Sequence, residues 1–354
     1  MRFVIYSAAA ALALALPGCG SGGGGGAQAQ VQAASVNAEG FRAYLPELRA
    51  RAVGSGVSQR TLDQVFPALT FSARTVELDR AQPGGTSGST ATPPFAPYRR
   101  QHVNQALISG GARRYAASLP RLQEIGRRYG VTPSILVAIW GHETSYGAVT
   151  GNFDLLDSLA SLAYEGRRRE LFASEFVAAL KMMDRGVPRS RLKGSWAGAT
   201  GYPQFLPSVY LRLAVDGDGD GQPNIWSSET DALSSIANYL SNAGWKPGVP
   251  WGIPVSVPAG FDRSGLANRL VSPRCPRVHQ RHSRWMSMAE WRRLGIVPQG
   301  AAWPRDTEMA SLLEPDGPGE TAYLLTTNYR TILDYNCSNF YALSVGLLAD
   351  AVSR

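Results

Sequence analysis

A single acid follows an otherwise apolar stretch of this chain. Residues 135–141 read Ile-Leu-Val-Ala-Ile-Trp-Gly, and Glu143 comes two positions later. Thr132 is suited to cap a helix and Pro133 to occupy its first turn, so a helix is predicted to begin here. The residues three, four and seven positions before Glu143 are all apolar, so the acid shares the face that such a helix would bury. The sequence therefore predicts a carboxyl group inside the protein.

Burial raises the pKa of a carboxyl group, because the charged form loses its hydration inside a protein. A carboxyl that stays protonated near neutral pH can serve as a general acid. We therefore interpret Glu143 as a catalytic acid. The alternative, which this segment alone leaves open, is a structural glutamate paired with Arg113 or Arg114.

The first 19 residues predict export. Met1 and Arg2 precede an apolar run up to Leu16, which is too short for a permanent membrane span and is typical of a signal peptide. The ending Leu-Pro-Gly-Cys resembles a bacterial lipobox, so Cys19 is the expected lipidation site; an ordinary cleaved signal peptide is the alternative. We expect a lipid-anchored periplasmic protein, and Gly20 favours the outer membrane of a Gram-negative bacterium.

Two cysteines remain once Cys19 is set aside. Cys275 and Cys337 both lie in the C-terminal part of the chain, and a disulfide between them is the favoured interpretation in an oxidising periplasm. Two free thiols are the alternative, because the sequence gives no distance between them.

Composition indicates a globular protein with a basic surface. Of 354 residues, 44% are hydrophobic and 18% charged, and the formal charge of +8 becomes +7 when Arg2 leaves with the signal peptide. A basic surface favours an acidic partner. Because no nucleic-acid-binding motif accompanies it, we predict no nucleic-acid partner and consider the peptide carboxylates of a bacterial cell wall instead. A charge that only serves solubility is the alternative.

Hydrophobic periodicity divides the mature chain and predicts a mainly α fold with a small β contribution. Short strands are expected near 252–257 and 321–325, and a final helix over 339–352. The predicted regions are a flexible tether (20–36), a helical region with a loop (37–97), a largely helical domain (98–250) and a mixed C-terminal region (251–354).

Residues 194–207 are rich in glycine and aromatic residues, which is typical of a loop that lines a groove. Small residues let a ligand approach closely, and Ser195 and Gln204 can hydrogen-bond hydroxyl or acetamido groups. The rings of this segment offer flat apolar faces to sugars, although each ring taken singly is more often a core residue.

Residues 216–227 begin like an EF-hand calcium loop. The sequence Asp-Gly-Asp-Gly-Asp-Gly fills its first six positions as the motif requires, but Ser227 at the twelfth cannot supply a bidentate carboxylate, so Glu229 or Asp231 would have to replace it. A turn held by hydrogen bonds from backbone amides to the aspartates is the alternative. The predicted ligands of a structural Ca²⁺ are Asp216, Asp218, Asp220, Gln222 and Asp231.

Several motifs in order along the chain resemble the membrane-bound lytic murein transglycosylase B family, glycoside hydrolase family 103. This resemblance implies a lysozyme-like α domain, a flanking α domain and a small irregular or β core domain that carries the EF-hand-like loop, with residues 251–354 completing an active-site groove. The matching stretches are 130–147, 194–207, 216–226, 237–240, 244–245, 335–336 and 341–342.

The resemblance also implies roles for individual residues. It matches Glu143 to the catalytic acid, and Ser195 and Asn336 to side chains that orient it. Along the groove for the glycan it places Tyr98, Arg167, Arg168, Tyr202, Gln204, Phe205, Tyr239, Tyr335 and Tyr341.

The implied reaction cleaves the β-1,4 bond between N-acetylmuramic acid and N-acetylglucosamine in peptidoglycan glycan strands. One glutamate acts as acid and then as base, the product carries a 1,6-anhydromuramyl end, and catalysis needs no cofactor. Further expected partners are the membrane, through the lipid anchor, and other wall-remodelling proteins. Asp154, Asp157 and Glu165 are available as second acids, so a muramidase that uses water stays open, as does a non-catalytic wall-binding lipoprotein.

Overall fold

A computed structural model describes residues 36–82, 93–268, 270–272, 274–275 and 277–354. The predicted signal peptide, Cys19 and the tether up to residue 35 lie outside the described residues. Within the described ranges, no helix has both the length and the apolar character needed to cross a bilayer.

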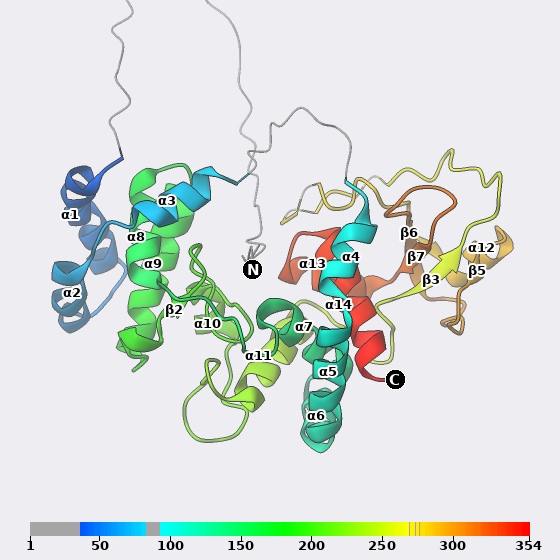
Figure 1. The fold of residues 1–354 in the computed structure, drawn as a ribbon, viewed down its shortest axis with the longest axis horizontal. Helices are drawn as coiled ribbons and strands as arrows, with labels where there is room; N and C mark the ends of the chain where they lie inside the picture. The colour runs from blue at the N-terminus through cyan, green and yellow to red at the C-terminus, as the bar shows by residue number, and fades with distance from the viewer. Residues whose placement is uncertain (1–35, 83–92, 269, 273, 276) are drawn as a thin grey trace, which may run out of the picture.

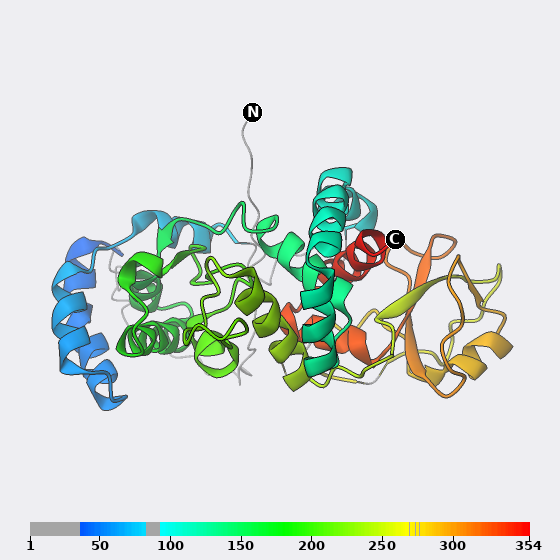
Figure 2. The ribbon, with the colours of Figure 1, turned by 90° about the horizontal axis from the view of Figure 1, so that it is seen from below.

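Helices dominate the structure, and a small sheet stands at one end (Figure 1). The predicted fold class, mainly α with a small β contribution, is confirmed. Figures 1 and 2 show three groups along the longest axis: a helical arm, a central body of helices, and the sheet. The arm consists of α1 (Ala38–Gly54), α2 (Gln59–Val65), η1 (Phe66–Ala68), α3 (Ala73–Arg80), α8 (Leu155–Glu165) and α9 (Arg169–Asp184).

Polar side chains start the helices of the arm and join them to one another. Asn37 accepts a hydrogen bond from the amide of Gly40, and Ser58 accepts one from Thr61, so each satisfies an amide that the first helical turn leaves free. The hydroxyl of Ser58 also donates to Asp184 at 2.6 Å. This bond ties the start of α2 to the end of α9.

The helix α7 (Pro133–Thr144) lies at the centre of the body and packs against α5, α6, α11 and α14. Pro133 occupies its first turn as predicted, whereas the side chain of Thr132 makes no capping hydrogen bond, so that prediction is wrong. The final helix, α14, spans residues 339–352, as predicted. The other helices of the body are α4 (Phe95–His102), α5 (Gln105–Ala117), α6 (Leu119–Tyr129), α10 (Pro207–Leu213), α11 (Glu229–Asn242), α13 (Thr327–Tyr335) and α14 (Asn339–Val352).

The sheet has the strand order β4-β6-β7-β3-β5, and every pair is antiparallel. Its apolar face and α12 form a separate small core around Trp291, whose ring nitrogen donates to the carbonyl of Ala310 at 3.0 Å. The two predicted strands are confirmed as β3 and β7. The elements are β3 (Gly252–Ser256), β4 (Met286–Ser287), α12 (Met288–Arg293), β5 (Val297–Pro298), β6 (Met309–Leu313) and β7 (Ala322–Leu325); β1 (Phe153–Asp154), β2 (Lys193–Gly194) and η2 (Arg189–Arg191) lie outside this sheet.

Buried polar contacts join the sheet to the central body. The ring of His282 lies between Ser311 of β6, at 3.0 Å from its hydroxyl oxygen, and Asn339 of α14, at 2.8 Å from its Oδ1. Beside them a disulfide links Cys275 to Cys337, with Cα atoms 5.4 Å apart. The segment between α13 and α14 is therefore fixed by a covalent bond and by a buried hydrogen-bond network.

Replacing both cysteines by serine is expected to lower the free energy of unfolding by roughly 4 kcal/mol, because the disulfide closes a loop of 62 residues and restricts the unfolded chain. Chemical denaturation of the parent and of Cys275→Ser/Cys337→Ser without reductant measures the difference. The fully reduced parent is the matched control and should resemble the variant. Equal denaturation midpoints for variant and oxidised parent would contradict this expectation.

Candidate active site

A cavity of about 830 Å³ opens where α9 of the arm faces the central body. We call it the groove. Its size and its mixture of aromatic and polar lining residues are typical of a ligand-binding site. The lining comes from segments far apart in the sequence: α4 and α5, the end of α7, α9, residues 195–206 and residues 334–341.

Glu143 lies in the last turn of α7 and lines the groove. Its Oε1 accepts a hydrogen bond of 2.6 Å from the hydroxyl of Tyr341 in α14. Burial raises the pKa of Glu143 to about 7, and the Tyr341 hydrogen bond opposes part of that rise because it favours the carboxylate. A carboxyl with this pKa can both donate and accept a proton near neutral pH.

The arginines considered as structural partners of this acid have other roles. The guanidinium of Arg114 lies over the rings of Trp140 and Tyr146, at 5.4 and 4.8 Å from their centroids. Arg113 lines the groove as well, and the hydrogen bond that the structure gives Glu143 is to Tyr341. The interpretation as an Arg-paired structural glutamate is therefore not supported.

A row of stacked rings runs beside Glu143. Tyr98 stacks on His102 with ring centroids 3.8 Å apart, His102 on His142 at 5.0 Å, and His142 meets the ring of Tyr341 edge-on at 4.5 Å. Burial, and to a smaller extent the neighbouring His102, lowers the pKa of His142 to about 3. His142 is thus neutral at physiological pH, and the row adds no positive charge next to the acid.

The end of α7 is set by a tight turn. Ser145 and Tyr146 both adopt left-handed backbone conformations, with φ of 48° and 61°. The ring of Tyr146 fits against glycines: a Cβ at Gly111 or Gly141 would come within 2.3 or 2.5 Å of its atoms. Its hydroxyl donates to the carbonyl of Leu107 at 2.7 Å. This anchored ring fixes the turn that follows Glu143.

The loop 195–206 presents polar and aromatic groups to the groove. The hydroxyl oxygen of Ser195 accepts a hydrogen bond from the amide of Ala199 at 3.0 Å, and the residue is 8% exposed. Gln204 has a left-handed backbone, with φ of 50°, and its side-chain amide donates to the carbonyl of Gly201 at 2.9 Å. Such contacts hold both side chains in place before a ligand binds.

Tyrosines of α11 and α13 also line the groove. The hydroxyl of Tyr335 donates to the carbonyl of Pro203, and that of Tyr239 to the carbonyl of Asp334, both at 2.6 Å. Asn336, which is 7% exposed, also lines the groove. Both predicted orienting residues, Ser195 and Asn336, thus share one cavity with Glu143.

Seven of the nine predicted substrate-binding residues line the groove, and two do not. Tyr202 packs its ring against Trp140, at 5.6 Å between centroids, and lies behind the lining. The side chain of Arg167 points toward α3 instead, where it binds Asp79. The seven are Tyr98, Arg168, Gln204, Phe205, Tyr239, Tyr335 and Tyr341.

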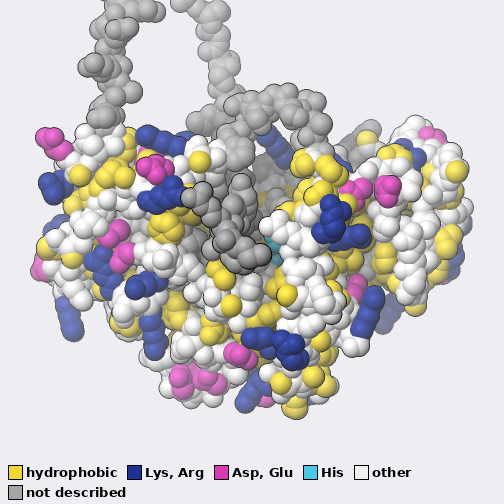
Figure 3. Space-filling view, in the orientation of Figure 1, with side chains coloured by type: hydrophobic (Ala, Val, Ile, Leu, Met, Phe, Trp, Pro, Cys, Tyr) yellow, Lys and Arg dark blue, Asp and Glu magenta, His cyan; other side chains and the backbone are white. Residues whose placement is uncertain are grey.

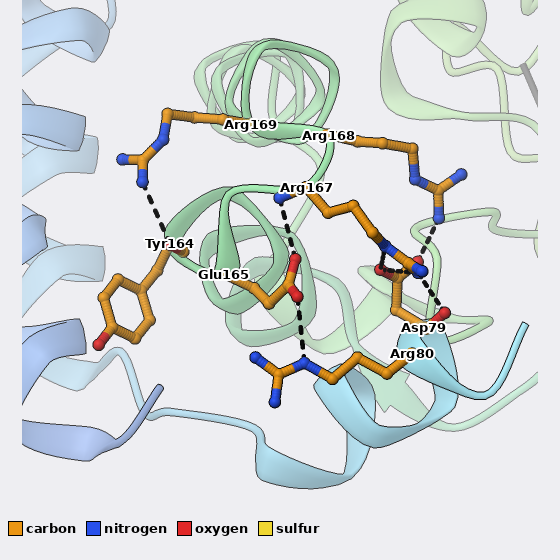
Figure 4. A network of polar contacts seen from close by, with 7 residues as sticks. All are labelled: Asp79, Arg80, Tyr164, Glu165, Arg167, Arg168 and Arg169. Carbon is orange, nitrogen blue, oxygen red and sulfur yellow. Dashed lines mark hydrogen bonds and ion pairs between the residues drawn. The ribbon is translucent and has the colours of Figure 1, made fainter. Parts of the chain in front are cut away.

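The position of Arg167 follows from a buried acid in α3. Asp79 is 1% exposed and pairs with both Arg167 and Arg168, as Figure 4 shows. A buried carboxylate needs such partners. Arg168 also packs over the ring of Phe172 and reaches the groove, whereas Arg167 donates its amide to Glu165 at 3.0 Å. Arg167 therefore joins α3 to the α8–α9 turn, which corrects its expected place along the groove.

The acids considered from sequence as second catalytic groups lie outside the groove lining. Asp154 and Asp157 accept hydrogen bonds from Arg189 at 3.0 and 3.2 Å. Glu165 pairs with Arg80 at 3.1 Å. Each is committed to holding neighbouring elements together.

Two other acids line the groove and were missed by sequence reasoning. Glu175 of α9 is 5% exposed and accepts hydrogen bonds from the amide and the hydroxyl of Ser208, at 2.9 and 2.6 Å. Asp334 of α13 is the other. The apolar period of α9 places Glu175 beside buried Phe172 and Phe176, a signal that could have identified it.

In the EF-hand-like loop, four carboxylates converge within 4.8 Å of one another, and Asp231 rather than Glu229 completes the set. The hydrogen bonds expected for a plain turn are present too: Asp216 accepts from the backbone amides of Gly219 at 2.6 Å and Gly221 at 2.8 Å. The backbone amide of Gln222 donates to Asp220 at 2.8 Å. The four converging residues are Asp216, Asp218, Asp220 and Asp231.

Comparison with known proteins gives consistent matches along nearly the whole chain. Residues 40–350 match the family described as "Transglycosylase SLT domain". The chain is 33% identical over 325 residues to membrane-bound lytic murein transglycosylase B of Escherichia coli (strain K12), covering 90% of this chain and 80% of that protein.

Solved structures are similar as well. SltB3 from Pseudomonas aeruginosa in complex with NAG-NAM-pentapeptide has a TM-score of 0.78 and 39% identity, covering 88% of this chain and 79% of that one. Escherichia coli Slt35 in complex with calcium has a TM-score of 0.68 and 29% identity, covering 90% of this chain and 93% of that one.

The raised pKa of Glu143 predicts how stability varies with pH. Because the folded state holds the proton up to about pH 7 and the unfolded state only to about 4.5, the parent should lose stability relative to Glu143→Gln as pH rises between these values. The resulting difference in the free energy of unfolding between the two proteins reaches about 3 kcal/mol at most, since the Glu143 side chain keeps some contact with solvent in the groove. Denaturant titrations at pH 4, 5.5, 7 and 8 measure it.

Glu170→Gln, which removes an exposed carboxylate of α9, is the matched control for the loss of a surface charge. A gap between parent and Glu143→Gln that does not widen from pH 4 to 7 would contradict the raised pKa.

Proposed function

This chain belongs to the transglycosylase SLT domain family and is a lytic murein transglycosylase acting on peptidoglycan, and from that premise we propose that Glu143 alone supplies its acid and its base. The proposed bond is the β-1,4 linkage from N-acetylmuramic acid to N-acetylglucosamine. The observation that carries the proposal is the placement of one carboxyl with a pKa of about 7 in a groove lined by tyrosines.

The first step is protonation. Glu143, protonated, donates its proton to the glycosidic oxygen as the bond between that oxygen and the muramyl C1 breaks. The Tyr341 hydroxyl, 2.6 Å from Oε1, then stabilises the carboxylate that remains. The rest of the strand leaves with a free hydroxyl group.

The second step closes a ring. The muramyl C6 hydroxyl oxygen attacks C1, and its proton passes to the carboxylate of Glu143, which restores the starting state. The product is a 1,6-anhydromuramyl end, and water is not consumed. Because the substrate supplies the nucleophile and its acetamido group can stabilise the positive charge at C1, a second catalytic carboxylate is unnecessary.

A muramidase would need another carboxylate to activate water or to attack the sugar. The groove offers Glu175 and Asp334 for that role. Glu175 already accepts two hydrogen bonds from Ser208, which favours a role in positioning α10. Asp334 interacts with the charges of Arg274 and Arg330, so both acids have other partners, which favours the transglycosylase chemistry over hydrolysis.

The seven groove-lining residues identified above are the proposed glycan contacts. Their rings offer flat faces to sugars, and Gln204 and Arg168 offer hydrogen-bond donors. Basic side chains are spread over the visible face of the molecule (Figure 3), which suits a polymer that carries peptide carboxylates. The related SltB3 was determined with NAG-NAM-pentapeptide.

We further propose a periplasmic location with a lipid anchor at Cys19. The lipobox-like sequence supports the anchor, and the related Escherichia coli enzyme is named as membrane-bound. The proposed anchoring membrane is the outer membrane, and the proposed protein partners are other wall-remodelling proteins.

The EF-hand-like loop is proposed to hold a structural Ca²⁺. Four carboxylates lie together, and none of them forms an ion pair with a basic residue in the described part of the chain, so the donor set suits a hard divalent cation. The related Slt35 was determined in complex with calcium. The ligands would be the four converging aspartates, with Gln222 as the fifth residue expected from the motif.

Digestion of purified sacculi by a soluble form that begins after Cys19 tests the reaction. Mass spectrometry should find muropeptide ends lighter by one water than hydrolysed ends. Glu143→Gln should lower the rate by about 10² to 10⁴-fold while the melting temperature is retained, because it removes the only proposed acid and base. Glu170→Gln on the surface is the control. Reducing ends would instead support a muramidase, and an active Glu143→Gln would refute the assignment of the acid.

Chelation tests the calcium site. Excess EDTA should lower the melting temperature by about 5 °C if calcium was present at a hundred times its dissociation constant, and added Ca²⁺ should restore it. Asp218→Asn/Asp220→Asn should not respond to EDTA, because it removes two of the four carboxylates. A parent protein whose melting temperature ignores both EDTA and Ca²⁺ would show that the loop is a plain turn.

A further inference from the structure

The side of α4 that faces the groove carries a histidine that no step proposed above uses. His102 lies one helical turn after Tyr98, is partly exposed, and lines the groove together with it. Burial raises the pKa of Tyr98, and the charge of Glu143 adds to that rise. Tyr98 therefore lies near the acid, and His102 stands one ring further along the groove.

Contacts within the protein fix the orientation of the His102 ring. It stacks on the ring of Tyr98, with centroids 3.8 Å apart and planes 16° from parallel. It also stacks on the ring of His142, at 5.0 Å and 15°. Its Nδ1 lies 2.9 Å from the carbonyl oxygen of Tyr98. Both the plane of the ring and its rotation within that plane are thus determined before a substrate binds.

The contact at Nδ1 also fixes which nitrogen of His102 carries the proton. A carbonyl oxygen can only accept a hydrogen bond, so Nδ1 is protonated and donates to Tyr98. Burial lowers the pKa of His102, and the hydrogen bond to Tyr98 offsets part of that change, so the ring is neutral at physiological pH. In this tautomer Nε2 bears a lone pair and no hydrogen. It is therefore an acceptor only.

This acceptor is open to a ligand. Within the described residues Nε2 of His102 has no hydrogen-bond partner. It keeps accessible surface, whereas Nε2 of His142 is enclosed by the protein. A substrate donor that reaches Nε2 replaces water there, and no ring rotation has to be lost on binding because the ring is already held.

The helix that carries this acceptor is itself held in place from a distance. Asp316, between β6 and β7, accepts hydrogen bonds from the backbone amides of Phe95 and Ala96 at 2.6 and 3.0 Å, where Pro94 has no side chain that could cap α4. The ring of Phe95 packs against Phe340 of α14, with centroids 5.3 Å apart. The position of His102 relative to the groove is therefore set by the sheet region and by α14.

We propose that His102 is a specificity-determining residue of the groove, whose Nε2 accepts a hydrogen bond from an N–H or O–H group of the bound strand. An atom that only accepts favours hydroxyl and amide N–H groups over carboxylates. The donor belongs either to the glycan itself or to the first amide of its peptide stem. This assignment rests on the proposed function, because that function places a stem-bearing glycan in the groove.

Binding is tested without turnover, in the Glu143→Gln protein. Titration calorimetry uses soluble glycan strands that carry stems and the same strands stripped of stems by an amidase. His102→Phe keeps a ring for stacking and removes Nε2, so it should weaken binding by about three- to tenfold through the loss of one hydrogen bond. A loss with both substrates assigns the donor to the glycan, and a loss only with stem-bearing strands assigns it to the stem.

Two further variants separate the acceptor from the shape of the ring. His102→Gln places an amide oxygen close to the position of Nε2 and should recover most of the lost affinity. Gln105→Leu removes an exposed amide of α5 that does not line the groove, so it is the matched control and should bind like the parent. Parental binding of both substrates by His102→Phe, or binding by His102→Gln that is no tighter than by His102→Phe, would overturn the proposal.

Turnover separates this proposal from the proposed function. In the active enzyme His102→Phe should raise KM by the factor seen in binding and leave kcat within about twofold, because the contact is made before and during the reaction. A lower kcat with an unchanged KM would overturn the assignment, since it would show a disturbed acid instead. A parent that releases no anhydromuramyl ends would refute the reaction, while calorimetry would still decide the role of His102.

Discussion

The hydrogen bond between Glu143 and Tyr341 joins residues 198 positions apart, and the arrangement of the central helices serves it. A carboxyl at the end of a buried helix is costly unless it is protonated or hydrogen-bonded. Here α14 packs along α7 and brings the Tyr341 hydroxyl to Oε1, while the turn after Glu143 is fixed by the ring of Tyr146 in its glycine cradle. Helix packing therefore sets the ionisation of the group on which the chemistry depends.

A raised pKa survives only if positive charge is kept away from the carboxyl. Three of the basic residues that line the groove are held by other partners or are uncharged. Arg114 is held over two rings, Arg168 is paired with Asp79, and His142 is neutral because it is buried. The network of Figure 4 attaches α3 to the turn between α8 and α9. It also neutralises part of the positive charge that the arginines of this turn would otherwise bring to the groove.

Sequence reasoning succeeded where the signal is local. Pro133, the apolar run before Glu143 and the final helix depend on residues close together in the chain, and the structure places them as expected. It failed where the decisive partner is distant. Three consecutive arginines gave no sign of how each side chain is held, because the acid that binds Arg167 and Arg168 is Asp79, 88 and 89 residues away. Tyr202 was misplaced for a similar reason: whether its ring faces a ligand or Trp140 depends on tertiary packing.

Helix geometry separates the residues of α13. Arg330 and Asp334 are four residues apart and so share one side of the helix, whereas Tyr335, one residue further, is rotated by about 100°. Asp334 and Tyr335 line the groove, where the Tyr335 hydroxyl donates to the carbonyl of Pro203, whereas Arg330 stacks on Trp285 outside that lining. The disulfide and the His282–Asn339 contact hold the segment that follows. Because this segment is held in place, Tyr335 keeps its contact with the 195–206 loop and Tyr341 keeps its hydrogen bond to Glu143.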